Sequence, residues 1–207
     1  MSEALDENLI VVVQRLTLAD AQARGSRRVA VLRMAALGAL TAAAQASGAQ
    51  LGRLEKDERD APRPSNGWHW SISHTSLGDQ GLVAAAVSRS PVGVDVEAIA
   101  LPSQEVAERT LGPQERRLFE KGDAALTFAQ AWTAKEAVLK KLGLGLMAFS
   151  KVQIVDAQGE RCVVEHEATC HAVESRACEP FIVAVAGRAR EGVEWRVDEA
   201  AQKAGPP

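Results

Sequence analysis

Two carboxylates two residues apart are the first residues that could do chemistry. They lie in the segment 92–97, VGVDVE, as Asp95 and Glu97. If the valines take one face of a strand, the two carboxylates project together from the other, because side chains alternate along a strand. Like charges side by side destabilise a sheet unless a cation lies between them, and a divalent metal ion is the natural occupant. A solvated acidic strand face is the commoner interpretation of such a pair alone.

A second group lies in the helical segment 132–140, WTAKEAVLK. Trp132, Glu136 and Lys140 are spaced i, i+4 and i+8, so they form one stripe, with Lys135 about 100° around the helix from Glu136. An exposed Glu–Lys pair is the ordinary interpretation, but a tryptophan in the same stripe argues against full exposure. Mg²⁺ takes a few carboxylates and leaves positions for phosphate oxygens, beside which lysines supply charge. Asp95, Glu97 and Glu136 with the two lysines have that composition.

Two further basic side chains could reach a phosphate. His74 lies at the end of the strand-like segment 71–75, SISHT, where the chain enters a turn. Such a histidine is more often a plain surface residue. Arg63 lies between two prolines, in a stiffened loop.

The rest of the sequence alternates between helical and strand-like segments. We expect helices at 26–48, 105–112, 113–122 and 124–143, the last between an Asp123 cap and Gly143. Strands are expected at 9–16, 68–73, 81–87, 92–97, 150–156, 161–174, 180–188 and 192–197, with antiparallel pairing because the turns are short. This predicts an α+β fold of two similar halves, 1–100 and 101–207, with a disordered tail from about residue 199.

Composition narrows the class of protein. The 207 residues are 46% hydrophobic and 25% charged, which is enough apolar material for a core without a structural metal. A net charge of −3 disfavours a duplex-binding protein. Three cysteines outside any CxxC, no signal peptide and no uninterrupted apolar run of membrane length predict a soluble, cytoplasmic protein. Cys162, His166 and Cys170 are spaced about 13 Å apart along a strand, too far for one zinc ion.

Taken together, SISHT, PVGVDVE and FAQAWTAKEAVLKKLGLGL resemble the phosphopantetheinyl transferases, most closely the larger single-chain type that activates peptide and polyketide synthetases. The resemblance runs from about Arg63 to Leu146 and implies a pseudo-dimer with coenzyme A and Mg²⁺ in the cleft between its halves. It implies metal binding by Asp95, Glu97 and Glu136, and phosphate contacts from Lys135 and Lys140. The coenzyme A contacts it implies come from Ser73, His74, Arg63 and, in the first helix, Arg28.

The resemblance implies that a carrier-protein serine attacks the β-phosphate of coenzyme A and releases 3′,5′-ADP. Glu136 or a metal-activated water would take the serine proton, and Lys135 would assist. The partners are then coenzyme A and an apo acyl or peptidyl carrier protein, with no nucleic acid, no membrane and a monomeric enzyme. Two alternatives stay open: a metal-dependent nuclease, whose sites also combine D-x-E with a lysine, and a non-catalytic scaffold that binds coenzyme A or a carrier protein.

Overall fold

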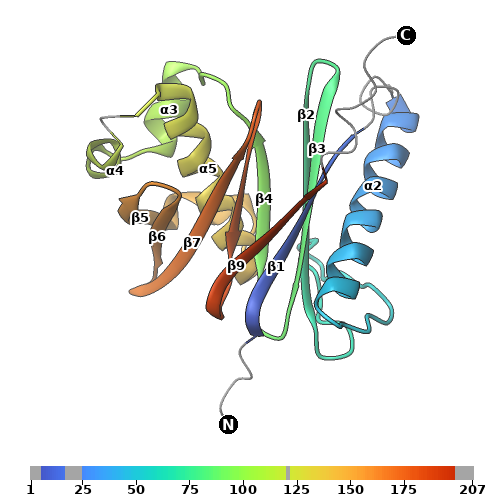
Figure 1. The fold of residues 1–207 in the computed structure, drawn as a ribbon. Helices are drawn as coiled ribbons and strands as arrows, with labels where there is room; N and C mark the ends of the chain where they lie inside the picture. The colour runs from blue at the N-terminus through green and yellow to red at the C-terminus, as the bar shows by residue number, and fades with distance from the viewer. Residues whose placement is uncertain (1–5, 17–24, 120–121, 199–207) are drawn as a thin grey trace.

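Two β-sheets carry the chain, and each is covered on its outer face by helices (Figure 1). The computed structural model describes residues 6–16, 25–119 and 122–198. In chain order, the elements are β1 (Asp6–Arg15), α2 (Gly25–Ala46), β2 (His69–Leu77), β3 (Gln80–Ser88), β4 (Gly93–Ala98), α3 (Gln104–Thr110), α4 (Pro113–Leu118), α5 (Ala124–Leu142), the 3-10 helix η1 (Leu146–Lys151), β5 (Val152–Gln158), β6 (Arg161–His166), β7 (Thr169–Cys178), β8 (Phe181–Ala186) and β9 (Ala189–Asp198).

The first sheet has the strand order β2-β3-β1-β9 and carries α2. Alanines such as Ala39 and Ala43 on the sheet side of α2 are fully buried, so the helix lies close to the strands. In β2 the alternation predicted from the sequence is confirmed. Trp70 packs under α2, while Ser71 and Ser73 face the other way, toward β4 and a cavity.

The second sheet has the order β4-β8-β7-β6-β5 and carries α5. α5 begins where the Asp123 side chain accepts a hydrogen bond from the amide of Leu126, and it ends at Gly143, whose φ of 66° lies in the left-handed region. Both caps agree with the sequence-based expectation. Alanines of α5 and its one valine, Val138, pack against Val164, Val173 and Ala184 of the sheet.

A third apolar cluster fills the space between the two sheets. It joins β1 and β3 to the valine face of β4 and to β8, and includes Val11, Val94, Val96, Phe181 and Val183. Because the valines of β4 point into this cluster, Asp95 and Glu97 face α5 instead, as the alternation predicts. β4 and β2 are edge strands of different sheets, and they meet through a hydrogen bond from the Val94 amide to Ser71 Oγ, 2.9 Å long.

Three features differ from the sequence-based expectations. β9 pairs with β1 in parallel, whereas every other strand pair is antiparallel among the described residues. β4 and β9 each lie in the sheet of the other half, so the sheets do not divide near residue 100. The segment 161–174 is a hairpin rather than one strand, because Glu167 and Ala168 turn the chain with positive φ. The predicted tail from 199 lies outside the described residues.

Among the described residues, α2 has the length and composition that could cross a membrane, with a mean hydropathy of 1.5 over Arg27–Ala46. The sequence holds no uninterrupted apolar run of membrane length here, because Arg27, Arg28 and Arg33 interrupt this segment. A helix that packs on a sheet passes the same test, and α2 buries Ala39 and Leu40 in this way while Val29 and Met34 stay exposed. No membrane role follows from its composition.

Candidate active site

A cavity of about 490 Å³ lies where β2 and β4 run side by side. The third wall is α5, which contributes Trp132, Glu136 and Lys140, and the fourth is the loop 56–62. The stripe predicted on α5 is therefore confirmed. The full lining is Lys56, Arg59, Asp60, Ala61, Pro62, Ser71, Ile72, Ser73, His74, Asp95, Val96, Glu97, Trp132, Glu136, Leu139, Lys140, Gly143, Gly145 and Leu146.

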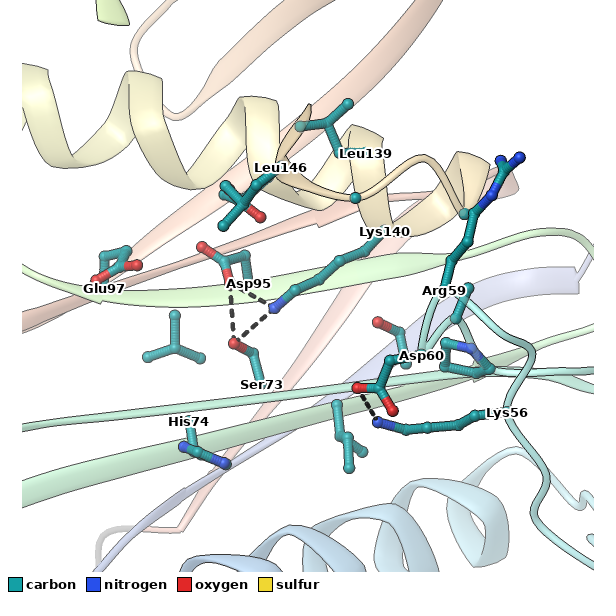
Figure 2. Close-up of a pocket in the computed structure, with 18 of the residues that line it drawn as sticks. Lys56, Arg59, Asp60, Ser73, His74, Asp95, Glu97, Leu139, Lys140 and Leu146 are labelled. Carbon is teal, nitrogen blue, oxygen red and sulfur yellow. Dashed lines mark hydrogen bonds and ion pairs between the residues drawn. The ribbon is translucent and has the colours of Figure 1, made fainter. Parts of the chain in front are cut away.

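Lys140 of α5 contacts both β2 and β4 at the centre of this cavity (Figure 2). Its Nζ lies 2.6 Å from Asp95 Oδ1 and 2.8 Å from Ser73 Oγ, and that hydroxyl donates to the same Asp95 oxygen at 2.9 Å. The side chain of Asp95 is 5% exposed and that of Lys140 is 31% exposed, so this ion pair is partly withdrawn from solvent. Lys140 therefore binds a carboxylate of the neighbouring strand, although Glu136 precedes it by one helical turn.

Gly93 allows β4 to lie directly on α5. A side chain there would meet backbone atoms, since a Cβ would lie 2.0 Å from the carbonyl oxygen of Ala137 and 2.4 Å from the amide nitrogen of Lys141. This close approach brings the carboxylates of β4 next to the acid and lysine of α5.

Three carboxyl groups share the cavity, and their charges oppose one another. Burial, followed by the charge of Asp95, raises the pKa of Glu136 from 4.5 to about 7, although Lys140 acts in the opposite direction. Burial and Asp95 likewise raise the pKa of Glu97, while a hydrogen bond from Trp132 lowers it. Near neutral pH, Glu136 therefore exchanges its proton easily.

The three carboxyl groups fit a divalent cation in the chemistry of their donors. Asp95 Oδ2 and Glu136 Oε1 are buried without a hydrogen-bond partner, which a bound cation would relieve. Over the described residues, however, no three Asp, Glu, His or Cys side chains are already arranged as a ligand group. The Lys140 ammonium supplies the positive charge against Asp95.

The side of the cavity formed by β2 and the loop 56–62 is basic. Lys56 and Arg59 reach it from the loop, and Lys56 Nζ forms an exposed ion pair with Asp60 at 2.7 Å. Burial is the main cause that lowers the pKa of His74, and the charges of Lys140, Arg28 and Lys56 lower it further. Arg28 does not line the cavity, but it hydrogen-bonds Ser76 Oγ at the end of β2.

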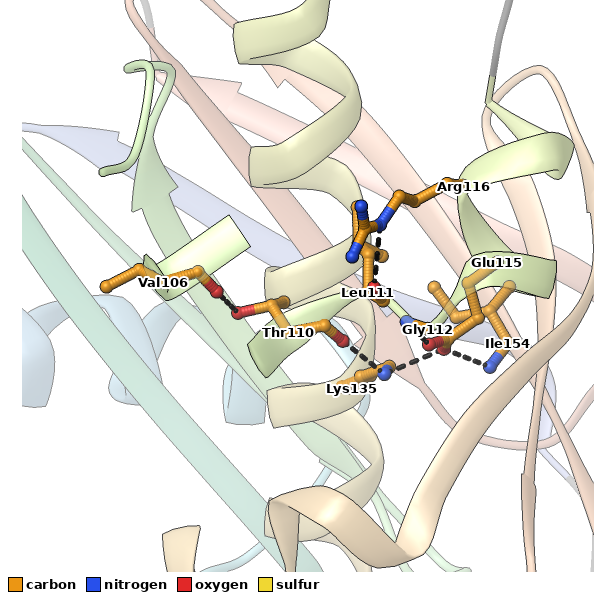
Figure 3. Close-up of polar contacts among 8 residues, drawn as sticks. All are labelled: Val106, Thr110, Leu111, Gly112, Glu115, Arg116, Lys135 and Ile154. Atoms are coloured by element: carbon orange, nitrogen blue, oxygen red, sulfur yellow. Dashed lines mark hydrogen bonds and ion pairs between the residues drawn. The ribbon is translucent and has the colours of Figure 1, made fainter. Parts of the chain in front are cut away.

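The structure brings Ser73, His74, Asp95, Glu97, Glu136 and Lys140 together, but it does not bring Lys135 or Arg63 to the cavity. Lys135 is buried on another side of α5, where its Nζ lies 2.7 Å from Glu115 Oε1 (Figure 3). Arg63 is exposed; its amide is bonded to the carbonyl of Glu55, and its carbonyl accepts from the indole of Trp70. The expected phosphate contacts of these two residues need correction on this geometry.

Sequence reasoning missed Lys56 and Arg59. Both lie in a charged loop that has no periodic pattern. The one signal that could have found them is that this loop shortly precedes the SISHT segment in the sequence. The loop folds back because Asp57 Oδ1 accepts the amides of Arg59 and Ala61, and because Asp60 takes a positive φ of 63°.

Two comparisons with known proteins gave a match to part of the chain. Residues 91–186 match the model of the 4′-phosphopantetheinyl transferase superfamily. Among solved structures, the crystal structure of Thermotoga maritima holo-[acyl-carrier-protein] synthase matches with 29% sequence identity and a TM-score of 0.40. The match covers 46% of this chain and 61% of that synthase, which is less than two thirds of its length. No curated protein matches the chain.

The matched segment holds both carboxylates of β4 and the acid and lysine of α5. Residues 91–186, slightly under half of the chain, are similar to the 4′-phosphopantetheinyl transferase superfamily.

Proposed function

We propose that this protein transfers the 4′-phosphopantetheine group of coenzyme A to a serine of an apo acyl or peptidyl carrier protein and releases 3′,5′-ADP. The observation that supports this best is the meeting of Asp95, Glu97, Glu136 and Lys140 at one cavity within the segment that matches the superfamily. The cavity, of about 490 Å³, falls within the usual size range of small-molecule sites.

In the proposed reaction, the serine oxygen forms a bond to the β-phosphorus of coenzyme A, and the bond from that phosphorus to the bridging oxygen breaks. The serine proton passes to Glu136, which lines the cavity beside Lys140; burial raises the pKa of this carboxyl to about 7 before a cation binds, and a bound cation would lower it. Lys140 holds a phosphate oxygen, for which it exchanges its contact with Asp95. Phosphoryl transfer depends chiefly on such positioning and charge.

The N-terminal side of the cavity binds the nucleotide end of coenzyme A in this proposal. Ser73, His74, Lys56 and Arg59 face the cavity, and Arg28 adds positive charge beside it. A phosphate near His74 would raise the pKa that burial and the neighbouring cations lower, and would make the ring a better donor.

Asp95, Glu97 and Glu136 are the residues that would hold Mg²⁺, on the evidence of their shared cavity and their two unpartnered oxygens. When bound, the ion would neutralise charge on the pyrophosphate. We also propose that the two layers form a pseudo-dimer within a cytoplasmic monomer, because each of the two sheets carries one long helix.

The test is intact-mass measurement of apo carrier proteins from several pathways after incubation with this protein, coenzyme A and Mg²⁺. The expected result is a mass gain of one phosphopantetheine on the carrier together with release of 3′,5′-ADP. Binding of coenzyme A without either product would favour the non-catalytic scaffold, and nicking of plasmid DNA would favour the nuclease. The cavity itself combines Asp95 and Glu97 with Lys140, as a nuclease site could, so the similarity of residues 91–186 to the superfamily is what favours phosphopantetheine transfer over that alternative.

A further inference from the structure

Lys135 and Glu136 are neighbours on α5 but serve different sides of the helix. Glu136 lines the cavity, whereas Lys135 is 3% exposed and donates to Glu115 Oε1 and to the carbonyl of Thr110, both at 2.7 Å (Figure 3). Successive residues of a helix project about 100° apart, so the direction of Lys135 sets the direction of Glu136.

Glu115 ties this lysine to two other segments. Its Oε2 accepts the amide of Gly112 at 2.7 Å, and its Oε1 also accepts the amide of Ile154 at 2.8 Å. The ion pair therefore joins α5 to the end of α3, to the start of α4 and to β5 at one buried point (Figure 3).

Small side chains make up much of the apolar contact of α5 with its sheet, beside Val138 and Leu139. They include Ala131, Ala134 and Ala137 on the helix and Ala184 and Ala186 on β8, all fully buried. Methyl groups make shallow ridges, so they fix the angle of a helix about its axis less well than large interlocking side chains. A directional buried ion pair can fix that angle.

We propose that Lys135 and Glu115 are positioning residues, which hold the rotation of α5 at the angle that aims Glu136 and Lys140 into the cavity. This inference rests on the proposed function, because it assigns a purpose to the direction of those two side chains. It also replaces the direct phosphate contact that the sequence suggested for Lys135.

The test variant is Lys135→Met/Glu115→Gln, which removes both charges and so leaves no buried charge alone; the glutamine can still accept the hydrogen bond from Ile154. The matched control is Val183→Ala, which weakens the core between the sheets on the side away from α5. If the double variant does not fold, Lys135→Arg is measured instead, because it keeps the charge but changes the length of the contact.

The first readout needs no activity. The protein has four tryptophans, so a ¹⁵N spectrum shows few indole resonances. The resonance of Trp132 is the one that is missing from the spectrum of Trp132→Phe. We expect that resonance to move in the double variant and to stay in place in Val183→Ala. The second readout is kcat per folded molecule, which we expect to fall about 100-fold in the double variant with a smaller change in the KM for coenzyme A.

An unmoved Trp132 resonance, or a kcat per folded molecule equal to that of Val183→Ala, overturns the positioning role and leaves the pair merely structural. If the unmodified protein transfers nothing to any carrier protein, the proposed function fails instead. The Trp132 resonance then still decides whether the pair sets the angle of α5.

Discussion

At the scale of single residues, the site holds more carboxyl groups than cations that contact them. Asp95, Glu97 and Glu136 face one cavity, and Lys140 is the ammonium that contacts one of them. The charge of Asp95 raises the pKa of both glutamates, and that of Lys140 lowers both. Lys140 therefore stabilises the ionised acids in the free protein, and in the proposed reaction it is released to the phosphate.

Lys140→Ala should weaken coenzyme A binding by about 10- to 100-fold, because it removes a charge-assisted contact with phosphate. Calorimetric titration with coenzyme A measures the change. Lys141→Ala is the matched control, since it removes the same charge one residue away, where the lysine side chain lies 3.4 Å from His171 Nδ1 and outside the cavity. Equal losses in both variants would mean that only overall charge matters.

Glu136→Gln should stabilise the free protein at about pH 8, by about 1–3 kcal/mol when solvent screening is allowed for. The folded pKa is about 7 against an ordinary 4.5, so the folded state holds a proton that the unfolded state has lost. The contribution of Glu136 to the stability of the unmodified protein therefore falls as pH rises from 4.5 to about 7, and it stays lower above that.

Urea unfolding of Glu136→Gln and the unmodified protein, in a metal-free buffer, gives this difference across the pH range. The two free energies of unfolding should converge below about pH 4.5, where Glu136 is protonated in both states, and separate at about pH 8. A difference in unfolding free energy that does not depend on pH would mean that folding does not raise the pKa of Glu136. In the same variant, turnover should fall by orders of magnitude, because the proton acceptor is lost.

At the scale of elements, local periodicity accounts for what the sequence could predict. The two-residue repeat of β4 and the four-residue repeat of α5 placed Asp95, Glu97, Glu136 and Lys140 on the correct faces. Lys135 escaped this reasoning because its partner, Glu115, lies 20 residues away in sequence, and no period reports such a contact. The parallel pairing of β1 with β9 is likewise a contact between the two ends of the chain.

Gly93→Ala tests the closeness of β4 and α5. The added methyl would meet two backbone atoms that cannot rotate away, so the helix or the strand must shift, at a cost of about 1–3 kcal/mol or more. Thermal unfolding should show a clear loss of stability, and transfer activity should fall with the displaced carboxylates. Gly38→Ala in α2 is the control: its methyl would have only an ordinary contact with Gln14 at 3.8 Å, and stability should rise by up to about 1 kcal/mol. Equal behaviour of the two variants would contradict the close approach as the reason for glycine.

At the scale of the whole molecule, the cavity is polarised between the two sheets. The acids come from β4 and α5 on the second sheet, while Lys56, Arg59 and His74 belong to the first sheet and its loop. A ligand with a phosphate at one end and a reacting pyrophosphate near the acids would span both sides. Such a division predicts that binding responds to residues of the first sheet and its loop, and turnover to residues of the second sheet and α5.

Lys56→Met/Arg59→Met tests this division. The KM for coenzyme A should rise about tenfold or more, since two cations are lost and Asp60 is left without its ion-pair partner near the bound phosphate. The kcat should change much less, because the acids and Lys140 remain.

Arg63→Met is the control, because Arg63 is exposed in the same segment but does not line the cavity. The KM of this variant for coenzyme A should stay near that of the unmodified protein. Steady-state kinetics at low and high salt separates the outcomes, because the effect of exposed charges should weaken as salt rises. A fall in kcat with an unchanged KM would assign the loop to the chemical step and would contradict the polarised cavity.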